Sequence, residues 1–213
     1  MTIRCRKCES LGMTFQSTTV NPDEYIEGPI NSKIWIIGIN PKGDTRTITS
    51  RSKEEFQNFD PSRYSYFRDF KKVSESLYAN WKSSSSIVAH TDLVKCFSQS
   101  FPPKINDRFV DREQIILNCK GYLLIQIIRH KPKIIICNGT SVCREMINFF
   151  PPENGGEPYN KLTSYKTTCQ DDNNNNFSFW ILLSGFIGRI DDRNKRRLGK
   201  EIEKIIEEEE IKL

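Results

Sequence analysis

Four of the seven cysteines in this chain have positions that suit a single metal centre: Cys5, Cys8, Cys96 and Cys119. The first two form a Cys-x-x-Cys pair near the start of the sequence, and the other two flank one loop further along. Thiolate ligands favour zinc or an iron–sulfur cluster, and the spacing does not decide between them. The alternative is four unconnected buried thiols, because free cysteine is among the most buried residue types. We interpret the remaining three as packing residues: Cys137, Cys143 and Cys169.

Polar residues that could orient water or a ligand stand at the ends of apolar runs. Asn40 closes the stretch Lys-Ile-Trp-Ile-Ile-Gly-Ile-Asn, Asp92 follows His90 by two residues, and Ser184 ends a later run. A side-chain amide can accept a hydrogen bond from water and donate one to a neighbour. The alternative role for Asn40 is to open a turn, the alternative for His90 is packing, and the alternative for Asp92 is to cap local backbone amides.

Apolar runs alternate with helical patterns along the chain. Continuous apolar runs indicate strands that are covered on both faces, and four are found: residues 33–39, 87–95, 133–138 and 177–183. Apolar residues at helical spacing predict four helices: residues 65–81, 111–130, 140–150 and 191–211. The alternation predicts an α/β protein, a three-layer α/β/α sandwich around a short, mainly parallel four-stranded sheet. Ligands are then expected at the carboxyl ends of the strands.

A single domain is expected to span residues 1–213. Residues 1–32 should form a cysteine-bearing segment packed on it, 44–62 a polar loop and 151–176 a surface excursion. Hydrophobic residues make up 37% of the chain, which excludes a disordered protein. No apolar run approaches the roughly 20 residues of a membrane span, and no signal peptide is recognisable, so we expect a cytoplasmic protein. We also expect a monomer. The net charge of +5 is compatible with a polyanionic ligand.

Several segments resemble the uracil-DNA glycosylase superfamily, in the same order along the chain. "IWIIGINPKG" resembles motif 1, in the Gly-Ile-Asn-Pro version of the mismatch-specific and single-strand-selective branches. "HTDLVKCF" and "NCKGYLLIQIIRHKPKIIICNGTSVCREM" resemble the iron–sulfur enzymes of family four, as does the N-terminal Cys-x-x-Cys. The resemblance covers most of the chain except 44–62 and 151–176. It implies that the four cysteines named above hold a [4Fe–4S] cluster, with zinc as the alternative.

The sequence also departs from the family pattern. Motif 2 should read His-Pro-Ser, but the chain has Leu183-Ser184-Gly185 and no histidine there. Motif 1 has Asn-Pro where family four has Glu-Ala-Pro, and the gap between Cys96 and Cys119 is longer than usual for the family. Asp92 stands where the family has a base-reading asparagine. An ionised aspartate only accepts hydrogen bonds, so a preference for uracil is in doubt and an amino-bearing base becomes possible.

The resemblance assigns roles to three groups of residues. Asn40 would orient the attacking water, while Ser184 and Arg189 would assist the departing base. The base would be bound by six residues, with an aromatic ring stacked on it: Gly38, Ile39, Tyr66, Phe67, His90 and Asp92. DNA would be held by an apolar wedge and by basic residues at a helix start: Phe186, Arg193, Lys195 and Arg196. The alternatives are an apolar helix face for the two rings Tyr66 and Phe67, and a solvated helix start for the basic residues.

The function implied is that of a DNA glycosylase in base-excision repair. Its substrate would be uracil or a related damaged or deaminated base, in single-stranded DNA or a lesion-bearing duplex. Two alternatives remain open: a non-catalytic nucleic-acid-binding relative, and a nucleoside- or nucleotide-processing enzyme on the same scaffold.

Overall fold

The computed structural model describes residues 5–15, 17, 19–41, 52–98, 100–153 and 163–213. Its main feature is a five-stranded sheet with the strand order β2-β1-β5-β7-β6. Four of these strands run parallel to one another and lie in the predicted apolar runs: β1 (Ile34–Gly38), β2 (Val88–Asp92), β5 (Ile134–Asn138) and β7 (Asn176–Ser184). The α/β class and the mainly parallel sheet are therefore confirmed.

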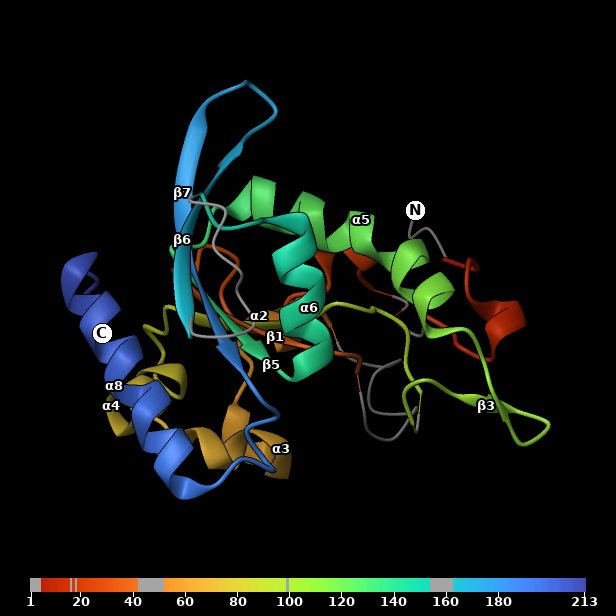
Figure 1. Ribbon diagram of the computed structural model, residues 1–213, viewed down its shortest axis with the longest axis horizontal. Coiled ribbons are helices and arrows are strands. Elements are labelled where there is room, and N and C mark those ends of the chain that lie inside the picture. The colour runs from red at the N-terminus through yellow and green to blue at the C-terminus, as the bar shows by residue number, and fades with distance from the viewer. Residues whose placement is uncertain (1–4, 16, 18, 42–51, 99, 154–162) are drawn as a thin grey trace.

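A fifth strand, β6 (Ser164–Gln170), pairs antiparallel with β7, and the two form a hairpin that extends beyond the rest of the sheet (Figure 1). The prediction of four strands is therefore wrong, and so is the prediction of a surface excursion for this part of 151–176. In β6, Tyr165 and Thr167 are buried, whereas Lys166 and Thr168 are exposed. This alternation is typical of an antiparallel strand with one face in water, and it lacks the apolar run that marks the parallel strands.

Four helices cover the two faces of the sheet: α5 (Arg112–His130), α6 (Thr140–Phe149), α4 (Glu75–Trp81) and α8 (Asp192–Glu208). Trp35 and Ile37 of β1 belong to the core under α5 and α6, while Ile34 and Ile36 belong to the core under α4 and α8. All four side chains are fully buried, and burying a side chain of this size stabilises the fold by about 1.5–3 kcal/mol. No helix in the described residues has both the length and the apolar composition needed to cross a membrane.

The predicted helix 65–81 is divided into three pieces: α3 (Ser65–Arg68), the 3₁₀ turn η4 (Asp69–Lys72) and α4. Ser74 starts α4 as a cap, because its hydroxyl accepts a hydrogen bond from the backbone N–H of Leu77. At the break, α8 packs closely on the backbone before α4. Gly199 of α8 faces the carbonyl of Val73, and a β-carbon on Gly199 would collide with it. The apolar residues of 65–81 therefore keep a helix-like spacing although the helix is broken before Ser74.

Shorter elements complete the described chain: η1 (Glu9–Leu11), η2 (Pro22–Glu24), α2 (Lys53–Gln57), η3 (Pro61–Arg63) and the hairpin of β3 (Lys104–Ile105) and β4 (Arg108–Phe109). The predicted polar loop 44–62 thus contains α2 and η3, while its part 44–51 lies outside the described residues. Ser52 and Glu55 start α2 with a reciprocal capping box.

The N-terminal segment contributes to the core under α5 and α6. Met13, Phe15, Tyr25 and Ile26 are at most 3% exposed and belong to that core. The backbone of Glu27 pairs with that of His90 through two hydrogen bonds of 2.7 Å, alongside β2. Residues far apart in sequence are thereby held at the outer edge of β2.

Replacing Gly199 with alanine is expected to lower the free energy of unfolding by about 3 kcal/mol, because α8 must move away from the Val73 carbonyl. Gly121 is the matched control, since it also lies inside a helix but has open space where a β-carbon would be. Alanine there should stabilise the protein by about 1 kcal/mol through helix propensity. Denaturant unfolding of both variants measures the difference, and equal stabilities would contradict the close packing of α8.

Candidate active site and metal centre

Four residues form a row along the carboxyl edge of the sheet, on the face under α4 and α8. Gly38 is the register partner of Asp92, and Asn138 is the partner of Ser184. Because Ile37 pairs with Cys137, Gly38 stands level with Asn138, so the row runs Asp92, Gly38, Asn138, Ser184. With neighbouring strands about 4.8 Å apart, Ser184 lies about 14 Å from Asp92. The topology brings Asp92 and Ser184 to one edge and one face of the sheet, with β1 and β5 between them.

A buried group of charged side chains occupies the Asp92 end of this row. His90 Nδ1 lies 2.7 Å from Glu27 Oε2, and His90 Nε2 lies 3.7 Å from Asp92 Oδ1. The two site residues are almost inaccessible, with Asp92 2% and His90 4% exposed. Gly38 makes this arrangement possible, because a β-carbon there would collide with Asp92 Oδ1 and approach His90 Nε2 and Tyr66 Oη.

Burial and mutual attraction shift the protonation of this group. Desolvation raises the pKa of Asp92 to about 6, against the opposing attraction of His90. Burial alone would lower the pKa of His90, but the carboxylates of Asp92 and Glu27 outweigh it and raise the pKa. The two carboxylates therefore favour the protonated form of the His90 imidazole. Lys95 supplies a further buried cation beside them, and its burial lowers its pKa to about 7.

Asn138 joins the row to the aromatic side chains above it, and the sequence analysis did not select it. Its Nδ2 donates to Tyr66 Oη at 2.7 Å, and its Oδ1 accepts from the backbone N–H of Ile187 at 2.8 Å. The ring of Phe186 packs on that of Tyr66 with centroids 5.4 Å apart. Asn138 ends an apolar run as Asn40 does, so the same rule applied to residues 133–138 would have identified it.

The two predicted stacking rings have different environments. Phe67 is 4% exposed and contacts Phe59, Trp81 and His90, so it belongs to the core. Tyr66 is half-buried at the sheet edge, beside Phe186. Phe67 therefore has the packing role that was its alternative, and stacking by Tyr66 remains a prediction.

Asn40 is fixed by contacts with the loop after β2. Its Nδ2 donates to the hydroxyl of Ser98 at 3.1 Å, and lies 3.0 Å from the carbonyl oxygen of Pro41. Ile39, which precedes it, is half-buried, and its carbonyl accepts from the backbone N–H of Val94. These bonds set the orientation of the amide and leave its oxygen as the group that can accept from water.

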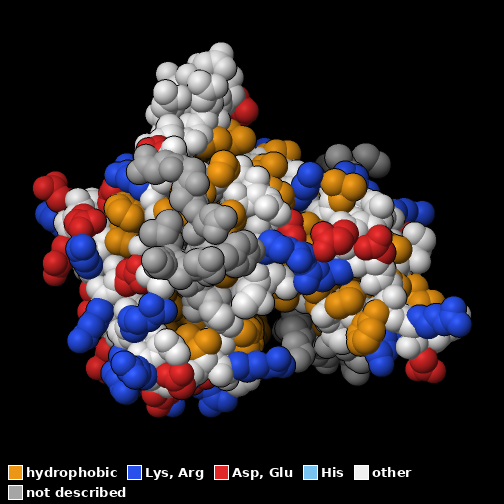
Figure 2. All heavy atoms as spheres, in the orientation of Figure 1, with side chains coloured by type: hydrophobic (Ala, Val, Ile, Leu, Met, Phe, Trp, Pro, Cys, Tyr) orange, Lys and Arg blue, Asp and Glu red, His pale blue; other side chains and the backbone are white. Residues whose placement is uncertain are grey.

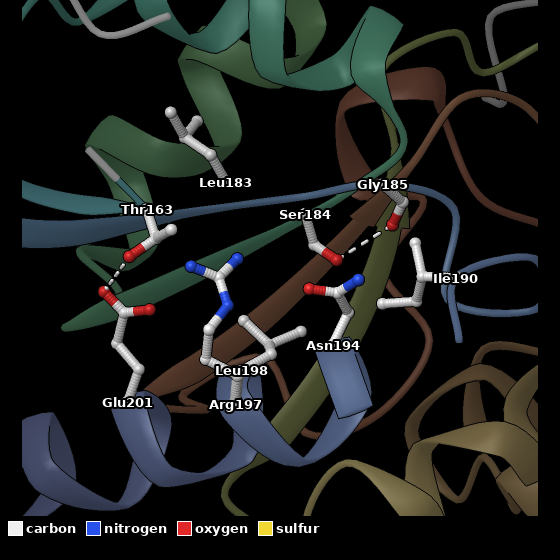
Figure 3. A pocket seen from close by; sticks show the side chains of 9 residues that line it. All are labelled: Thr163, Leu183, Ser184, Gly185, Ile190, Asn194, Arg197, Leu198 and Glu201. Atoms are coloured by element: carbon white, nitrogen blue, oxygen red, sulfur yellow. Dashed lines mark hydrogen bonds between the residues drawn. The ribbon is translucent and has the colours of Figure 1, made fainter. Parts of the chain in front are cut away.

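Ser184 opens into a pocket of about 180 Å³ between β7 and the start of α8 (Figure 3). Its hydroxyl donates to the carbonyl of Gly185 at 2.8 Å, and Asn194 and Arg197 extend toward it from α8 (Figure 3). Glu201 closes the far side, where it accepts a hydrogen bond of 2.6 Å from Thr163. This pocket is polar and is separate from the buried charged group at Asp92.

The basic residues of α8 divide into exposed and buried members. Arg193 and Arg196 are exposed, and basic side chains interspersed with acidic ones lie over this part of the surface (Figure 2). Lys195 is 4% exposed and pairs with Asp69 at 3.2 Å, so the prediction that it contacts DNA phosphates is wrong. Its charge instead holds α8 against η4. The guanidinium of Arg189 lies 5.6 Å from the ring centroid of Phe186.

Three of the predicted metal ligands meet at a second site. The Sγ atoms of Cys8, Cys96 and Cys119 all lie within 4.8 Å of one another, and all three residues are buried. Cys5 is also buried, and its Sγ accepts a hydrogen bond from Tyr122 Oη at 3.5 Å, one turn beyond Cys119 on α5. The structure therefore places three thiols close enough to bind one metal, and Cys5, the fourth predicted ligand, is not part of that group.

The three thiols shift one another's protonation. Hydrogen bonds from Cys119 and Cys96 lower the pKa of Cys8 to about 3, and the hydrogen bond with Cys8 raises the pKa of Cys119 to about 11. One thiolate is therefore stabilised by its two neighbours. A metal cation could replace the protons of these S–H hydrogen bonds. It would then be bound by the sulfur atoms of Cys8, Cys96 and Cys119, which come from three separate parts of the chain.

Lys95 connects the metal centre to the row. It directly precedes Cys96, and its Nζ donates to the carbonyl of Asp92 at 2.5 Å and to Gln126 Oε1 at 2.6 Å. Gln126 in turn donates to the carbonyl of Tyr25 at 3.0 Å. The end of β2, helix α5 and the N-terminal segment are thus tied together between the cysteines and Asp92.

No protein-family model matches the sequence, and a comparison with curated proteins finds no match. The resemblance to the glycosylase superfamily therefore remains a prediction from the motifs alone.

The raised pKa of Asp92 predicts a specific pH dependence. The unfolded carboxyl titrates near 3.8 and the folded one near 6, so between these values the folded state binds more protons and loses stability as the pH rises. Asp92→Asn removes this loss. From pH 4 to pH 6, the free energy of unfolding of Asp92→Asn should rise by about 2 kcal/mol relative to that of the unsubstituted protein. Denaturant unfolding at both pH values measures this difference, and a constant difference would contradict the shifted pKa.

Proposed function

We propose that this protein is a DNA glycosylase that hydrolyses the bond between a damaged base and its deoxyribose. The observation that carries the proposal is the buried Asp92–His90 pair at the carboxyl edge of the sheet, beside a glycine and an aromatic side chain. The edge where parallel strands end is the usual place for a ligand in this class of fold. The motif resemblance supports the same chemistry, and with it we propose that the fold is a three-layer α/β/α sandwich.

In the proposed reaction the target nucleotide leaves the DNA stack and its base enters the site over Gly38. The base stacks on Tyr66 in the place that Phe186 now occupies, with its polar edge toward Asp92 and His90. Asn40 orients a water through its amide oxygen. The water oxygen bonds to C1′ as the bond from C1′ to the base nitrogen breaks, and one water proton is transferred to the departing base or to solvent.

Negative charge develops on the base as it departs, and His90, whose Nε2 lies 3.7 Å from Asp92 Oδ1, would be the donor that stabilises it. Ser184 lies about 14 Å from Asp92, so we assign it to the backbone of the DNA instead, together with the pocket that Arg197 lines. Arg189, Arg193 and Arg196 lie on the same side and would contact phosphates. Phe186 would fill the gap left in the base stack.

We further propose that Cys5, Cys8, Cys96 and Cys119 hold a [4Fe–4S] cluster, with a single zinc as the alternative. The donor set fits either group, because both are bound by thiolates. When bound, the group would have a structural role and would join the N-terminal segment to the end of β2 and to α5. Iron, zinc and sulfide contents of protein purified without oxygen distinguish the two.

Release of free base tests the catalytic proposal. Metal-replete protein is incubated with oligonucleotides that carry uracil, hypoxanthine, xanthine or 8-oxoguanine, and the released bases are identified by mass spectrometry. Asn40→Ala serves as the inactive control. The proposal fails if no base is released from any of these oligonucleotides.

A non-catalytic DNA-binding relative is the second candidate, and the Leu183-Ser184-Gly185 sequence in place of the motif-2 histidine favours it. Such a protein would bind the same oligonucleotides with a strong salt dependence and release nothing. A nucleoside-processing enzyme would instead cleave free nucleosides and leave DNA intact.

A further inference from the structure

Two polar atoms in the buried charged group have no hydrogen-bond partner among the described residues. They are Asp92 Oδ2 and His90 Nε2, and both belong to side chains that are more than nine-tenths buried. An unpaired buried polar atom costs about 1–3 kcal/mol, and more when it is charged. Two such atoms on adjacent side chains indicate the place where a ligand supplies the missing partners.

The pattern of donors and acceptors follows from the contacts. A carboxylate only accepts hydrogen bonds, so the 2.7 Å contact with Glu27 requires a proton on His90 Nδ1. Asp92 Oδ1 lies 3.7 Å from His90 Nε2 and favours a second proton there. Tyr66 Oη accepts from Asn138, so its own proton remains available as a donor. The site thus presents a carboxylate with two accepting oxygens, flanked by donors.

We propose that the base bound by this site is a 2-amino-6-oxopurine, that is, guanine or a lesion such as 8-oxoguanine that keeps the same Watson–Crick edge. A carboxylate binds best to two adjacent N–H donors, and guanine carries the ring N1–H next to the exocyclic N2 amine. The neighbouring O6 is the acceptor that His90 Nε2–H requires.

The other common bases match this pattern less well. Uracil has one N–H between two carbonyl oxygens, so one oxygen of the carboxylate would face repulsion. Cytosine and adenine place an accepting ring nitrogen beside their amine, which also opposes a carboxylate. Hypoxanthine has the N–H and O6 of guanine but lacks the amine. A site that forms hydrogen bonds with a polar group of its ligand rejects an analogue without that group, because buried atoms of the site are then left without partners.

This inference rests on the proposed function, and binding to uncleavable DNA tests it separately from catalysis. The full-length, metal-replete protein is titrated with single-stranded oligonucleotides in which one 2′-fluoro nucleotide carries 8-oxoguanine, guanine, hypoxanthine or uracil. Fluorescence anisotropy at pH 8, where Asp92 is ionised, gives the dissociation constants. We expect 8-oxoguanine and guanine to bind about tenfold more tightly than hypoxanthine. Guanine and hypoxanthine differ only in the N2 amine, so this comparison measures the contribution of that one hydrogen-bonding group.

Asp92→Asn is the matched variant, because an amide of the same shape has one donor and one acceptor. It should lose the preference for the guanine edge and bind uracil more tightly than the unsubstituted protein does. Gly121→Ala should leave all four affinities unchanged. Equal binding of guanine and hypoxanthine would overturn the inference, and so would a preference for uracil by the unsubstituted protein. Release of uracil without these preferences would preserve the glycosylase proposal and remove only the guanine assignment.

Discussion

Gly38→Ala is expected to reduce the rate of base release by about 100-fold. A β-carbon at this position would collide with Asp92 Oδ1, and it would also press on His90 Nε2 and Tyr66 Oη at 3.1 and 3.2 Å. Asp92 must therefore turn away from the place where it would meet the base. Displacement of a reacting group or its partner by about 1 Å can cost 100-fold in rate. Single-turnover release of the preferred base measures the effect.

Stability and a second glycine provide the controls for this prediction. The loss of free energy of unfolding in Gly38→Ala should stay within about 1–3 kcal/mol, so the protein remains folded at 25 °C. Gly121→Ala, which meets nothing within 4 Å, should retain the full rate. A folded Gly38→Ala protein with unchanged base release would show that the row at the sheet edge is not the reaction site.

Cys96→Ser is expected to cause the largest loss of stability. Cys96 is 1% exposed, and its sulfur lies within 4.8 Å of those of Cys8 and Cys119. Without this thiolate the metal should be lost, because the three ligands come from separate parts of the chain. We expect the free energy of unfolding to fall by about 4 kcal/mol or more, which lowers the melting temperature by about 10 °C.

Cys169→Ser is the matched control for the metal centre. Cys169 lies on β6, is half-exposed and belongs to no group of thiols that could bind a metal in the described residues. Its replacement should leave both metal content and melting temperature unchanged. Metal analysis and thermal unfolding of both variants decide the matter. If Cys96→Ser keeps its metal and its stability, the three thiols are only packing residues.

The sequence predicts the parallel strands well, because each strand is marked by its own unbroken run of apolar residues. Ile34 to Ile37 and Ile134 to Ile136 are buried on both faces, so a strand there needs an unbroken apolar run. β6 escaped prediction because only every second residue faces the core. The break before α4 depends on Ser74 as a cap and on the close approach of Gly199, and apolar periodicity reports neither.

The site was partly predictable from the order of strands and helices. Topology alone brings the ends of β1, β2 and β7 to one edge, so Gly38, Asp92 and Ser184 could be placed together. Glu27 could not, because its contact with His90 depends on backbone pairing between residues 63 positions apart. Lys195 was misjudged because its partner, Asp69, is even more remote in sequence. Charge in a short segment does not show whether a side chain is exposed.

A structure of the protein with an oligonucleotide that carries one uncleavable 2′-fluoro-8-oxoguanosine tests the central claim most directly. The account predicts an extruded base between Tyr66 and Gly38, with its N1 and N2 within about 3 Å of the Asp92 carboxylate oxygens and its O6 near His90. DNA bound away from the carboxyl edge of the sheet, or a base that leaves Asp92 without a partner, would contradict it.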